Sequence, residues 1–317
     1  MNLTINILAL SLIKGVGASF IKKNLPLIEQ YSQSLDLLAM IGGKVNLQEL
    51  EYNIPKAQLI LKDCEENSIE VISILDNNYP PLLRLINDPP PILYLKGNIN
   101  LLSKAIAIIG TRKSNTLGND IAFRVGEYFS KNWSICNGLV DGIDKHSILK
   151  ENEVFENVIG VISGGLNFIN TSSLVTRELC EKVLNKNGLL ISENEPNKKE
   201  DRFSGSKASR IQAGLSNALI LIQSDKNGGS KYTLKSFAKT ERPLGIIDFK
   251  KNKEFQNEDI FSANRLIIEK RIEGIAEMCE IKKITDIRLK SIIPISKKSD
   301  YLTLEKEITA GNKVFKK

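Results

Sequence analysis

The stretch "AIAIIGTRKSNTLG", residues 105–118, decides the fold of this chain of 317 residues. Its apolar run, 105–110, ends directly before Thr111 and Arg112, and a short polar loop follows. A continuous apolar run bounded by turn residues is typical of a strand that is buried on both faces. An arginine just beyond such a strand needs a partner of opposite charge. That partner is either a carboxylate of this chain or a phosphate that the chain does not carry.

The same alternation of elements continues on the C-terminal side of this stretch. Apolar runs suited to buried strands recur at 132–136, 157–163, 188–192, 217–223 and 243–248. Segments with helical spacing lie between them, such as the one that carries Leu117, Ile121, Val125 and Phe129. Strands that alternate with helices in this way are typical of βαβ units. We therefore predict an α/β fold with an extended Rossmann-like, mostly parallel sheet and helices on both faces.

Glycines and hydroxyl-bearing residues follow several of the predicted strands. The carboxyl ends of parallel strands meet at one edge of a sheet, where ligands bind. Glycine lets the backbone approach a ligand closely, hydroxyls and helix N-terminal amides satisfy phosphate oxygens, and arginine adds a forked charge. The loop residues that we expect at a phosphate-binding edge are Gly110, Thr111, Arg112, Ser114, Gly118, Gly138, Gly142, Gly164, Ser192, Ser230 and Thr233. The alternative for each glycine is simple chain reversal.

Two acidic residues near the same edge, Asp144 and Glu193, are expected to have structural roles in the loops. The alternative interpretation of Arg112 is a salt bridge to one of these two carboxylates. In that case the arginine would have its partner inside the chain and would not need a ligand.

Several classes of protein are disfavoured by motifs that the sequence lacks. There is no GxxxxGK[ST] P-loop, and the first strand–helix turn does not read GxGxxG, so neither of these nucleotide sites is expected. A lone histidine, His146, and four widely separated cysteines argue against a hydrolytic triad and a zinc site. We expect no cofactor and no metal. Scattered single cysteines fit a reducing cytoplasm, and no apolar run is long enough to span a bilayer.

The net charge of +7 is unevenly distributed. Residues 1–80 hold six Lys and Arg against nine Asp and Glu, whereas residues 81–250 hold 23 against 17. Residues 251–317 hold 15 against 11. A basic middle domain favours a polyanionic partner, although a compositional excess of lysine explains the charge equally well.

Three segments are expected along the chain. Residues 1–66 read as a helical module, and its glycine-bracketed turn, 14–17, either presents backbone N–H groups to a phosphate or merely joins two helices. Residues 67–275 hold the Rossmann-like domain. Residues 276–317 form a C-terminal extension, partly disordered, with the last fifteen or so residues poorly ordered. The stretch 264–280 reads as one amphipathic helix.

Seven stretches together resemble the DprA/Smf family of bacterial DNA-processing proteins. They fall in the family's order and spacing over about residues 79–270. The matching stretches are "YPPLLRLINDPPPILYLKGN" (79–98), "AIAIIGTRKSNTLG" (105–118), "NGLVDGID" (137–144), "GLLISENEP" (188–196), "FSGSKASRIQAGLS" (203–216), "GGSKYTLKSFA" (228–238) and "NRLI" (264–267). A helical N-terminal module also occurs in many members of the family.

The resemblance implies a protein that binds single-stranded DNA, delivers a RecA-type recombinase onto it during transformation and recombination, and is not an enzyme. It implies a homodimer without membrane association. Carried over to this sequence, Arg112 and Arg210 contact phosphates, Phe203 lies near an unstacked base, and Lys207 or Lys231 lines the groove. The alternatives are that Arg210 caps a helix or pairs with Glu193 and that Phe203 belongs to the core.

The sequence departs from the family pattern at several positions. The family's Arg-Asn pair before the retained arginine is replaced by Ala208 and Ser209, which removes one positive charge. The histidine that usually follows the Gly-Ile-Asp motif by four residues is absent, and His146, which follows it by two, does not correspond to it. These departures leave open a second function, a degenerate member that senses a nucleotide-derived signal in a phage-defence or mobile-element system. A third, nucleotide hydrolysis of the LOG type, is less favoured because the loop "NGGSKYTLKS" lacks the required glutamate.

Overall fold

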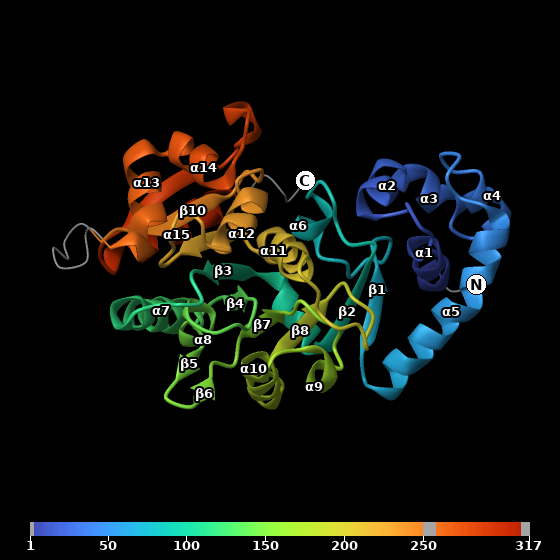
Figure 1. Ribbon diagram of the computed structural model, residues 1–317, viewed down its shortest axis with the longest axis horizontal. Helices are drawn as coiled ribbons and strands as arrows, with labels where there is room; N and C mark the ends of the chain where they lie inside the picture. Colours follow the sequence, from blue (N-terminus) through green and yellow to red (C-terminus); the bar gives the residue numbers. More distant parts are fainter. Residues whose placement is uncertain (1–2, 250–257, 312–317) are drawn as a thin grey trace.

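The computed structural model describes residues 3–249 and 258–311, and within them the main feature is a nine-stranded sheet (Figure 1). The strand order is β1-β2-β8-β7-β4-β3-β9-β10-β11. Every pairing from β8 to β11 is parallel, whereas β1–β2 and β2–β8 are antiparallel. The bounds are β1 (Glu70–Ser73), β2 (Ile92–Gly97), β3 (Ala105–Ile109), β4 (Ser134–Asn137), β7 (Val158–Val161), β8 (Leu189–Ser192), β9 (Ala218–Leu221), β10 (Pro243–Ile247) and β11 (Ser291–Ile295). A separate small hairpin consists of β5 (Leu149–Lys150) and β6 (Glu153–Val154).

The six strands predicted from apolar runs are confirmed as β3, β4, β7, β8, β9 and β10. Strands β1, β2 and β11 were not predicted as members of the sheet. Their sequences carry weaker signals, because β1 has only four residues, β2 directly follows a proline triplet, and β11 contains Pro294. A proline is tolerated in β11 because this strand lies at the edge of the sheet.

Helices cover both faces of the sheet. Figure 1 shows α7 (Thr116–Phe129) and α10 (Leu174–Asn185) on one side, and α11 (Ser204–Leu215) and α12 (Ser230–Phe237) on the other. Each face of the sheet packs against its own hydrophobic core, and alternate residues of β3 contribute to the two cores. Ile106 and Ile108 belong to the core that contains the buried residues of α7. Ala107 and Ile109 belong to the core that contains the buried residues of α12. This alternation follows from the two-residue period of a strand, and it explains why the run in β3 is apolar throughout.

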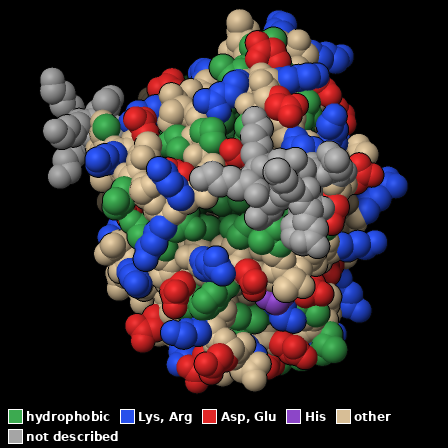
Figure 2. Space-filling model, turned by 90° about the vertical axis from the view of Figure 1, so that its left-hand side faces the viewer, with side chains coloured by type: hydrophobic (Ala, Val, Ile, Leu, Met, Phe, Trp, Pro, Cys, Tyr) green, Lys and Arg blue, Asp and Glu red, His purple; other side chains and the backbone are tan. Residues whose placement is uncertain are grey.

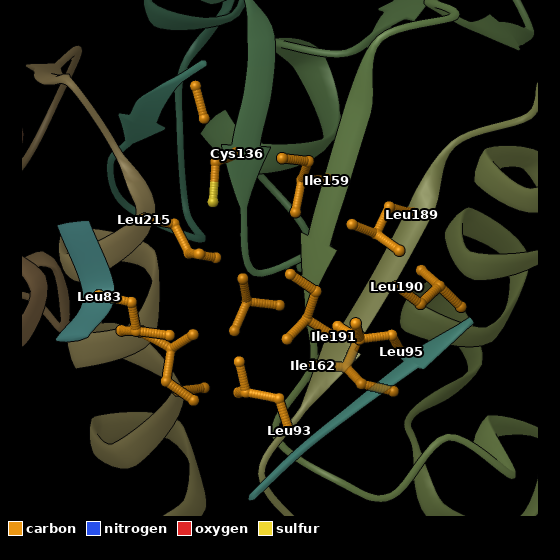
Figure 3. Packing of buried hydrophobic residues seen from close by; sticks show 14 of the residues in the cluster. Leu83, Leu93, Leu95, Cys136, Ile159, Ile162, Leu189, Leu190, Ile191 and Leu215 are labelled. Atoms are coloured by element: carbon orange, nitrogen blue, oxygen red, sulfur yellow. The ribbon is translucent and has the colours of Figure 1, made fainter. Parts of the chain in front are cut away.

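The core continues under the antiparallel end of the sheet. Figure 3 shows Leu93 and Leu95 of β2 beside Leu190 of β8, with Leu83 and Leu215 on the side of the helices. All five side chains are almost fully buried. Leu83 belongs to α6 (Pro81–Arg84), whose first residue is a proline, a position at which a helix needs no backbone N–H.

The N-terminal module is helical, as predicted. It contains α1 (Leu3–Ser11), α2 (Ala18–Lys23), α3 (Leu25–Tyr31), α4 (Leu35–Ala39) and α5 (Leu47–Glu66). Figure 1 shows it beside β1 and β2, and α1 contacts both strands. We call the described residues after the module, 67–249 and 258–311, the sheet domain. Two polar contacts dock the module on it. Lys22 Nζ donates to the carbonyl of Arg84 at 2.6 Å, and Asn197 Nδ2 donates to Asp63 Oδ2 at 2.9 Å.

The prediction of one helix over 264–280 is wrong. The chain forms α13 (Ser262–Lys270) and α14 (Ile272–Cys279), separated at Arg271, whose φ is 54° and ψ is −120°. The two helices pack so closely that a Cβ on Gly274 would lie 2.4 Å from the carbonyl oxygen of Leu266. Hydrophobic periodicity continues across the break because both helices bury the same kind of face, so the pattern alone does not reveal it.

Arg271→Gly is expected to stabilise the protein by about 1 kcal/mol. An arginine at φ 54° and ψ −120° occupies a region that is essentially restricted to glycine, so the substitution removes backbone strain. The opposing cost is the extra conformational freedom of glycine in the unfolded chain. Chemical denaturation measures the change, and Lys270→Gly, inside α13, is the control and should destabilise. An unstable Arg271→Gly variant would contradict the strained conformation.

The C-terminal segment belongs to the same sheet. Strand β11 pairs with β10, and α15 (Ser299–Gly311) follows it. The Glu305 carboxylate accepts hydrogen bonds from Tyr128 Oη at 2.9 Å and Trp133 Nε1 at 3.2 Å, which ties α15 to α7 and to the residue before β4. Poor order was expected from about residue 303, but residues 303–311 lie in α15 and 312–317 lie outside the described residues. The boundaries at 66 and 275 stay predictions.

A search of the helices in the ranges 3–249 and 258–311 finds none with the length and apolar character needed to cross a membrane.

Candidate functional site

The order of the strands creates a switch point beside β3. The chain proceeds from β3 to β4, β7 and β8 on one side, then returns to place β9 on the other side of β3. At such a point the loops that leave the two neighbouring strands diverge and open a crevice at their carboxyl ends. A cleft of about 1130 Å³ lies there, between the loops after β3 and β4 and the first turns of α11 and α12. The predicted residues that line it are Gly110, Thr111, Arg112, Gly138, Phe203, Ser230 and Thr233.

The loop after β3 is fixed by backbone contacts and leaves Arg112 exposed. The Thr111 N–H donates to the carbonyl of Gln223 at 2.7 Å, and the Thr111 carbonyl accepts from the Ile143 N–H at 3.1 Å. Gly110 has no room for a side chain, because a Cβ would lie 2.5 Å from Ile143 Cγ1. Arg112 and Lys113 follow, both exposed and both lining the cleft.

Arg112 makes no salt bridge within the part of the chain that the structure describes. The alternative of an ion pair with Asp144 or Glu193 is therefore not what the structure shows. Burial raises the pKa of the Asp144 carboxyl group, and the positive charge of the Arg112 guanidinium partly opposes this rise. The guanidinium of Arg112 is thus available to a ligand.

Asp144, for which a structural role was expected, is held among the loops of the cleft. It belongs to α8 (Ile143–His146), is buried below the cleft, and accepts a hydrogen bond from the Gly138 N–H at 2.8 Å. Burial raises the pKa of Asp144 to about 7, against the opposing effects of the Gly138 amide and Arg112. The floor of the cleft therefore changes charge near neutral pH.

The loop before α11 presents an aromatic ring and a cation. Asp201 Oδ1 accepts from the N–H groups of Phe203 at 2.8 Å and Ser204 at 2.9 Å, which fixes the loop just before the helix. The Phe203 side chain is 55 % exposed, so the alternative that it belongs to the core is wrong. The Arg202 guanidinium lies 4.5 Å from the centre of the Phe203 ring. Both residues line the cleft.

The opposite wall of the cleft is formed by the first turn of α12. Ser230 and Thr233 are buried, and the Ser230 hydroxyl is hydrogen-bonded to the Ser224 hydroxyl. Tyr232, which the sequence analysis did not single out, is 47 % exposed and also lines the cleft.

Arg210 takes the structural role that the sequence left as an alternative. Its side chain is 11 % exposed, and its guanidinium makes a two-point contact with Glu193, Nη1 to Oε1 at 2.7 Å and Nη2 to Oε2 at 2.6 Å. Its Nε lies 3.0 Å from Asp88 Oδ2, and its Nη1 donates to the Lys207 carbonyl at 2.8 Å. With its donors engaged inside the protein, Arg210 is not placed to contact a phosphate in the cleft.

The two lysines carried over from the family do not line this cleft. Lys231 lies 2.9 Å from Glu280 at the end of α14, because its side chain points to the far side of α12. Lys207 is exposed but lines a neighbouring groove between the sheet domain and the N-terminal module. Both positions follow from the helical turn, which rotates consecutive residues to different sides.

Five further predicted residues have packing or loop roles outside the cleft. A Cβ on Gly118 would lie 2.2 Å from Gln223 Oε1, one on Gly142 would lie 2.4 Å from the Thr111 carbonyl, and one on Gly164 would lie 2.7 Å from the Thr171 carbonyl. Gly142 also has a φ of +80°. These are the chain-reversal and close-approach roles of glycine. Ser192 Oγ donates to the Gly164 carbonyl at 2.7 Å, and the Ser114 hydroxyl donates to Asn119 Oδ1.

The exposed charges of the cleft are mostly positive. Arg112, Lys113 and Arg202 line it, and among the described residues of its lining the acidic ones are Asp225 and the buried Asp144. Lys113 and Arg202 were missed because they are surface residues without a motif, although each directly adjoins a predicted site residue. A search of the described ranges finds no group of three or more His, Cys, Asp or Glu side chains that could hold a metal.

A doubly wound sheet with a cationic cleft at its switch point, and without a P-loop or a GxGxxG turn, defines a Rossmann-like protein suited to a polyanion. The sequence profile of the family described as DNA recombination-mediator protein A matches residues 70–283. The chain belongs to this family, whose members are named DprA or Smf.

Two relatives illustrate the similarity in sequence. The DNA processing protein DprA of Bacillus subtilis is 34 % identical over 188 residues, which are 58 % of this chain and 62 % of the relative. The protein Smf of Synechocystis is 27 % identical over 202 residues, which are 62 % of this chain and 48 % of the relative. The matched region thus spans less than two thirds of either relative.

Two solved structures share the fold. DprA from Streptococcus pneumoniae superposes with a TM-score of 0.68 at 22 % identity, over 96 % of this chain and 98 % of that one. DNA processing protein A from Helicobacter pylori, whose structure describes a single-stranded DNA binding mode, gives a TM-score of 0.55 at 24 % identity. That match covers 64 % of this chain and 87 % of the Helicobacter chain.

Proposed function

We propose that the cleft binds single-stranded DNA without regard to sequence. Arg112, Lys113 and Arg202 contact the phosphates, and Phe203 stacks on an unpaired base. The observation that carries this proposal is that three exposed cations line one cleft beside an exposed aromatic ring and make no ion pair within the described ranges. A basic groove combined with an aromatic platform is the usual means of holding a single strand.

Membership of the family supports the proposal. The Bacillus subtilis and Streptococcus pneumoniae relatives are named DNA processing proteins, and the Helicobacter pylori protein binds single-stranded DNA. We further propose that this chain acts as a cytoplasmic homodimer that hands the strand to a RecA-type recombinase and carries out no chemical reaction. These finer points are taken from the family resemblance.

Equilibrium binding distinguishes the DNA-binding function from the nucleotide sensor. Fluorescence anisotropy with a labelled oligo-dT strand should show binding that weakens steeply with salt. A sensor would instead ignore the oligonucleotide and gain thermal stability with a small nucleotide. Release of free base from a nucleoside monophosphate would show the LOG-type hydrolysis. Either of the last two results, without oligo-dT binding, would contradict the proposal.

Phe203→Ala is expected to lower the affinity for oligo-dT by about 1–3 kcal/mol, which is the usual contribution of one stacked base. The fold should be unaffected, because the ring is 55 % exposed. Tyr52→Ala is the matched control, since Tyr52 is 69 % exposed and lies on α5 outside the cleft. Equal affinities of the two variants would rule out stacking on Phe203.

The affinity for oligo-dT is expected to fall by roughly three- to tenfold between pH 6 and pH 8 because Asp144 ionises beneath the phosphates. The pKa of Asp144 is raised to about 7, so the carboxyl group is mainly neutral below this pH and negative above it. His146, in the same helix, has a pKa lowered below its usual value by burial and by Lys145, so it stays neutral through most of this range.

Asp144→Asn tests this pH dependence. An asparagine oxygen can still accept the hydrogen bond from the Gly138 N–H, and the variant has no carboxyl group to ionise. Its affinity should therefore stay nearly constant from pH 6 to pH 8 in the same anisotropy assay. A pH dependence equal to that of the wild type would assign the titration to another group.

A further inference from the structure

A second groove adjoins the cleft. It has a volume of about 1080 Å³ and lies between the N-terminal module and the sheet domain, beside α11 and α12. Ser206 and Tyr232 line both the cleft and this groove, so the two spaces adjoin at these residues. We call it the inter-module groove. The helices of the module and α11, which supply residues to its walls, are labelled in Figure 1.

The inter-module groove has an excess of unpaired positive charge. Five lysines line it, and none of them makes an ion pair within the described residues. They come from both walls: Lys23 and Lys44 from the module, and Lys198, Lys207 and Lys235 from the sheet domain.

The carboxylates of the groove do not offset this charge. Asp88 and Glu193 both line it, but each is engaged by Arg210, so they do not pair with the lysines. Glu195 is the remaining carboxylate of the lining. The buried Arg210 thus has an electrostatic effect beyond its structural one, because it offsets one of the two charges of Asp88 and Glu193, and the five lysines exceed the acidic charge that remains.

Hydrogen bonds join the two walls of the groove. Lys22 donates to the Arg84 carbonyl and Asn197 donates to Asp63, and both bonds link the module to the sheet domain. The glycine-bracketed turn of the module faces open space, since a Cβ on Gly15 or Gly17 would meet no atom within 4 Å. The groove is therefore open at this turn.

We propose that a single strand of DNA leaving the cleft passes over Tyr232 and continues along the inter-module groove, where the lysines of both walls contact its phosphates. This inference rests on the proposed function of the cleft. A strand fits better than an acidic peptide for two reasons. The groove adjoins the cleft, and an exposed tyrosine stands where the two spaces meet, as a second stacking platform beyond Phe203. The N-terminal module thereby becomes half of the binding site.

A series of oligo-dT strands of increasing length tests this inference with the variant Lys23→Ala/Lys44→Ala. Both lysines are exposed on the module and neither lines the cleft. For a strand of about 20 nucleotides, we expect the variant to bind several-fold more weakly than the wild type, with a salt slope smaller by about 1.4. For the shortest strand that the wild type binds, the two proteins should have equal affinity. Lys56→Ala/Lys62→Ala, on α5, is the matched control with the same change in charge.

The outcomes separate this inference from the function on which it rests. Equal affinities of the variant and the wild type for every length would overturn the inference and leave the function of the cleft intact. Absence of binding to any length by the wild type would overturn the function itself. If the variant lost binding of a labelled poly-glutamate peptide but kept full affinity for long strands, the groove would belong to an acidic protein partner and the inference would be wrong.

Discussion

The triple variant Arg112→Ala/Lys113→Ala/Arg202→Ala is expected to bind oligo-dT at least about 100-fold more weakly than the wild type at low salt, if each phosphate contact contributes about 1 kcal/mol. All three side chains are exposed on the rim of one cleft. None of them has a salt-bridge partner in the described residues, and the one buried carboxyl group on which they act is that of Asp144, whose pKa is opposed in its rise by Arg112. The loss of affinity should therefore be accompanied by at most a small loss of stability, and this loss should be smaller below pH 7, where Asp144 is mainly neutral.

Anisotropy titrations and thermal unfolding measured on the same samples check both parts of this prediction. Lys56→Ala/Lys62→Ala/Lys131→Ala removes the same number of positive charges from exposed sites outside the cleft. Figure 2 shows that basic and acidic side chains are interspersed on the end of the molecule opposite the N-terminal module. If the control variant lost as much affinity as the cleft variant, net charge and not the cleft would hold the strand.

Arg210→Met is expected to destabilise the fold by about 3–5 kcal/mol, because it leaves the Glu193 carboxylate buried without its partner. For a chain of this size, such a loss lowers the melting temperature by roughly 5–10 °C. The double variant Arg210→Met/Glu193→Leu should be more stable than Arg210→Met, since it removes the unpaired buried charge. Asp88 tolerates the change, because its side chain is 46 % exposed and can be solvated.

The double variant Arg210→Met/Glu193→Leu also distinguishes a structural role of Arg210 from a contact between Arg210 and a phosphate. Per folded molecule, Arg210→Met/Glu193→Leu should keep its affinity for a short oligo-dT strand held in the cleft, because Arg210 does not line the cleft. A loss of affinity as large as that of Arg112→Ala, with an unchanged melting temperature, would instead show that Arg210 contacts the strand.

The interior of the sheet was predictable because its strands are apolar throughout. β3 and its neighbours are buried on both faces, so their runs stand out against the polar loops. Strands at the edges of the sheet follow no such rule. β1 begins with exposed Glu70, and β11 contains Pro294, which only an edge position accommodates.

The location of the candidate site was predictable, but the direction of its side chains was not. Loops after parallel strands gather at one edge whatever their sequence, so Gly110, Thr111 and Arg112 were expected there. Whether a helical arginine faces the ligand or the core depends on which side of the helix is packed. Arg210 lies among Ala208, Ser209 and Ile211 on a part of α11 that is buried all round, and its partner Glu193 is 17 residues away in the chain. Only the packing of α11 brings the two together.

The salt dependence of oligo-dT binding tests the central claim most directly. The claim is that the cations of the switch-point cleft contact DNA phosphates. For a single strand, each such contact contributes about 0.7 to the magnitude of the slope of log K, where K is the association constant, against the logarithm of the salt concentration. The account predicts that the slope of Arg112→Ala/Lys113→Ala/Arg202→Ala is smaller than that of the wild type by about 2. Identical slopes for the two proteins would contradict it, even if their affinities differed.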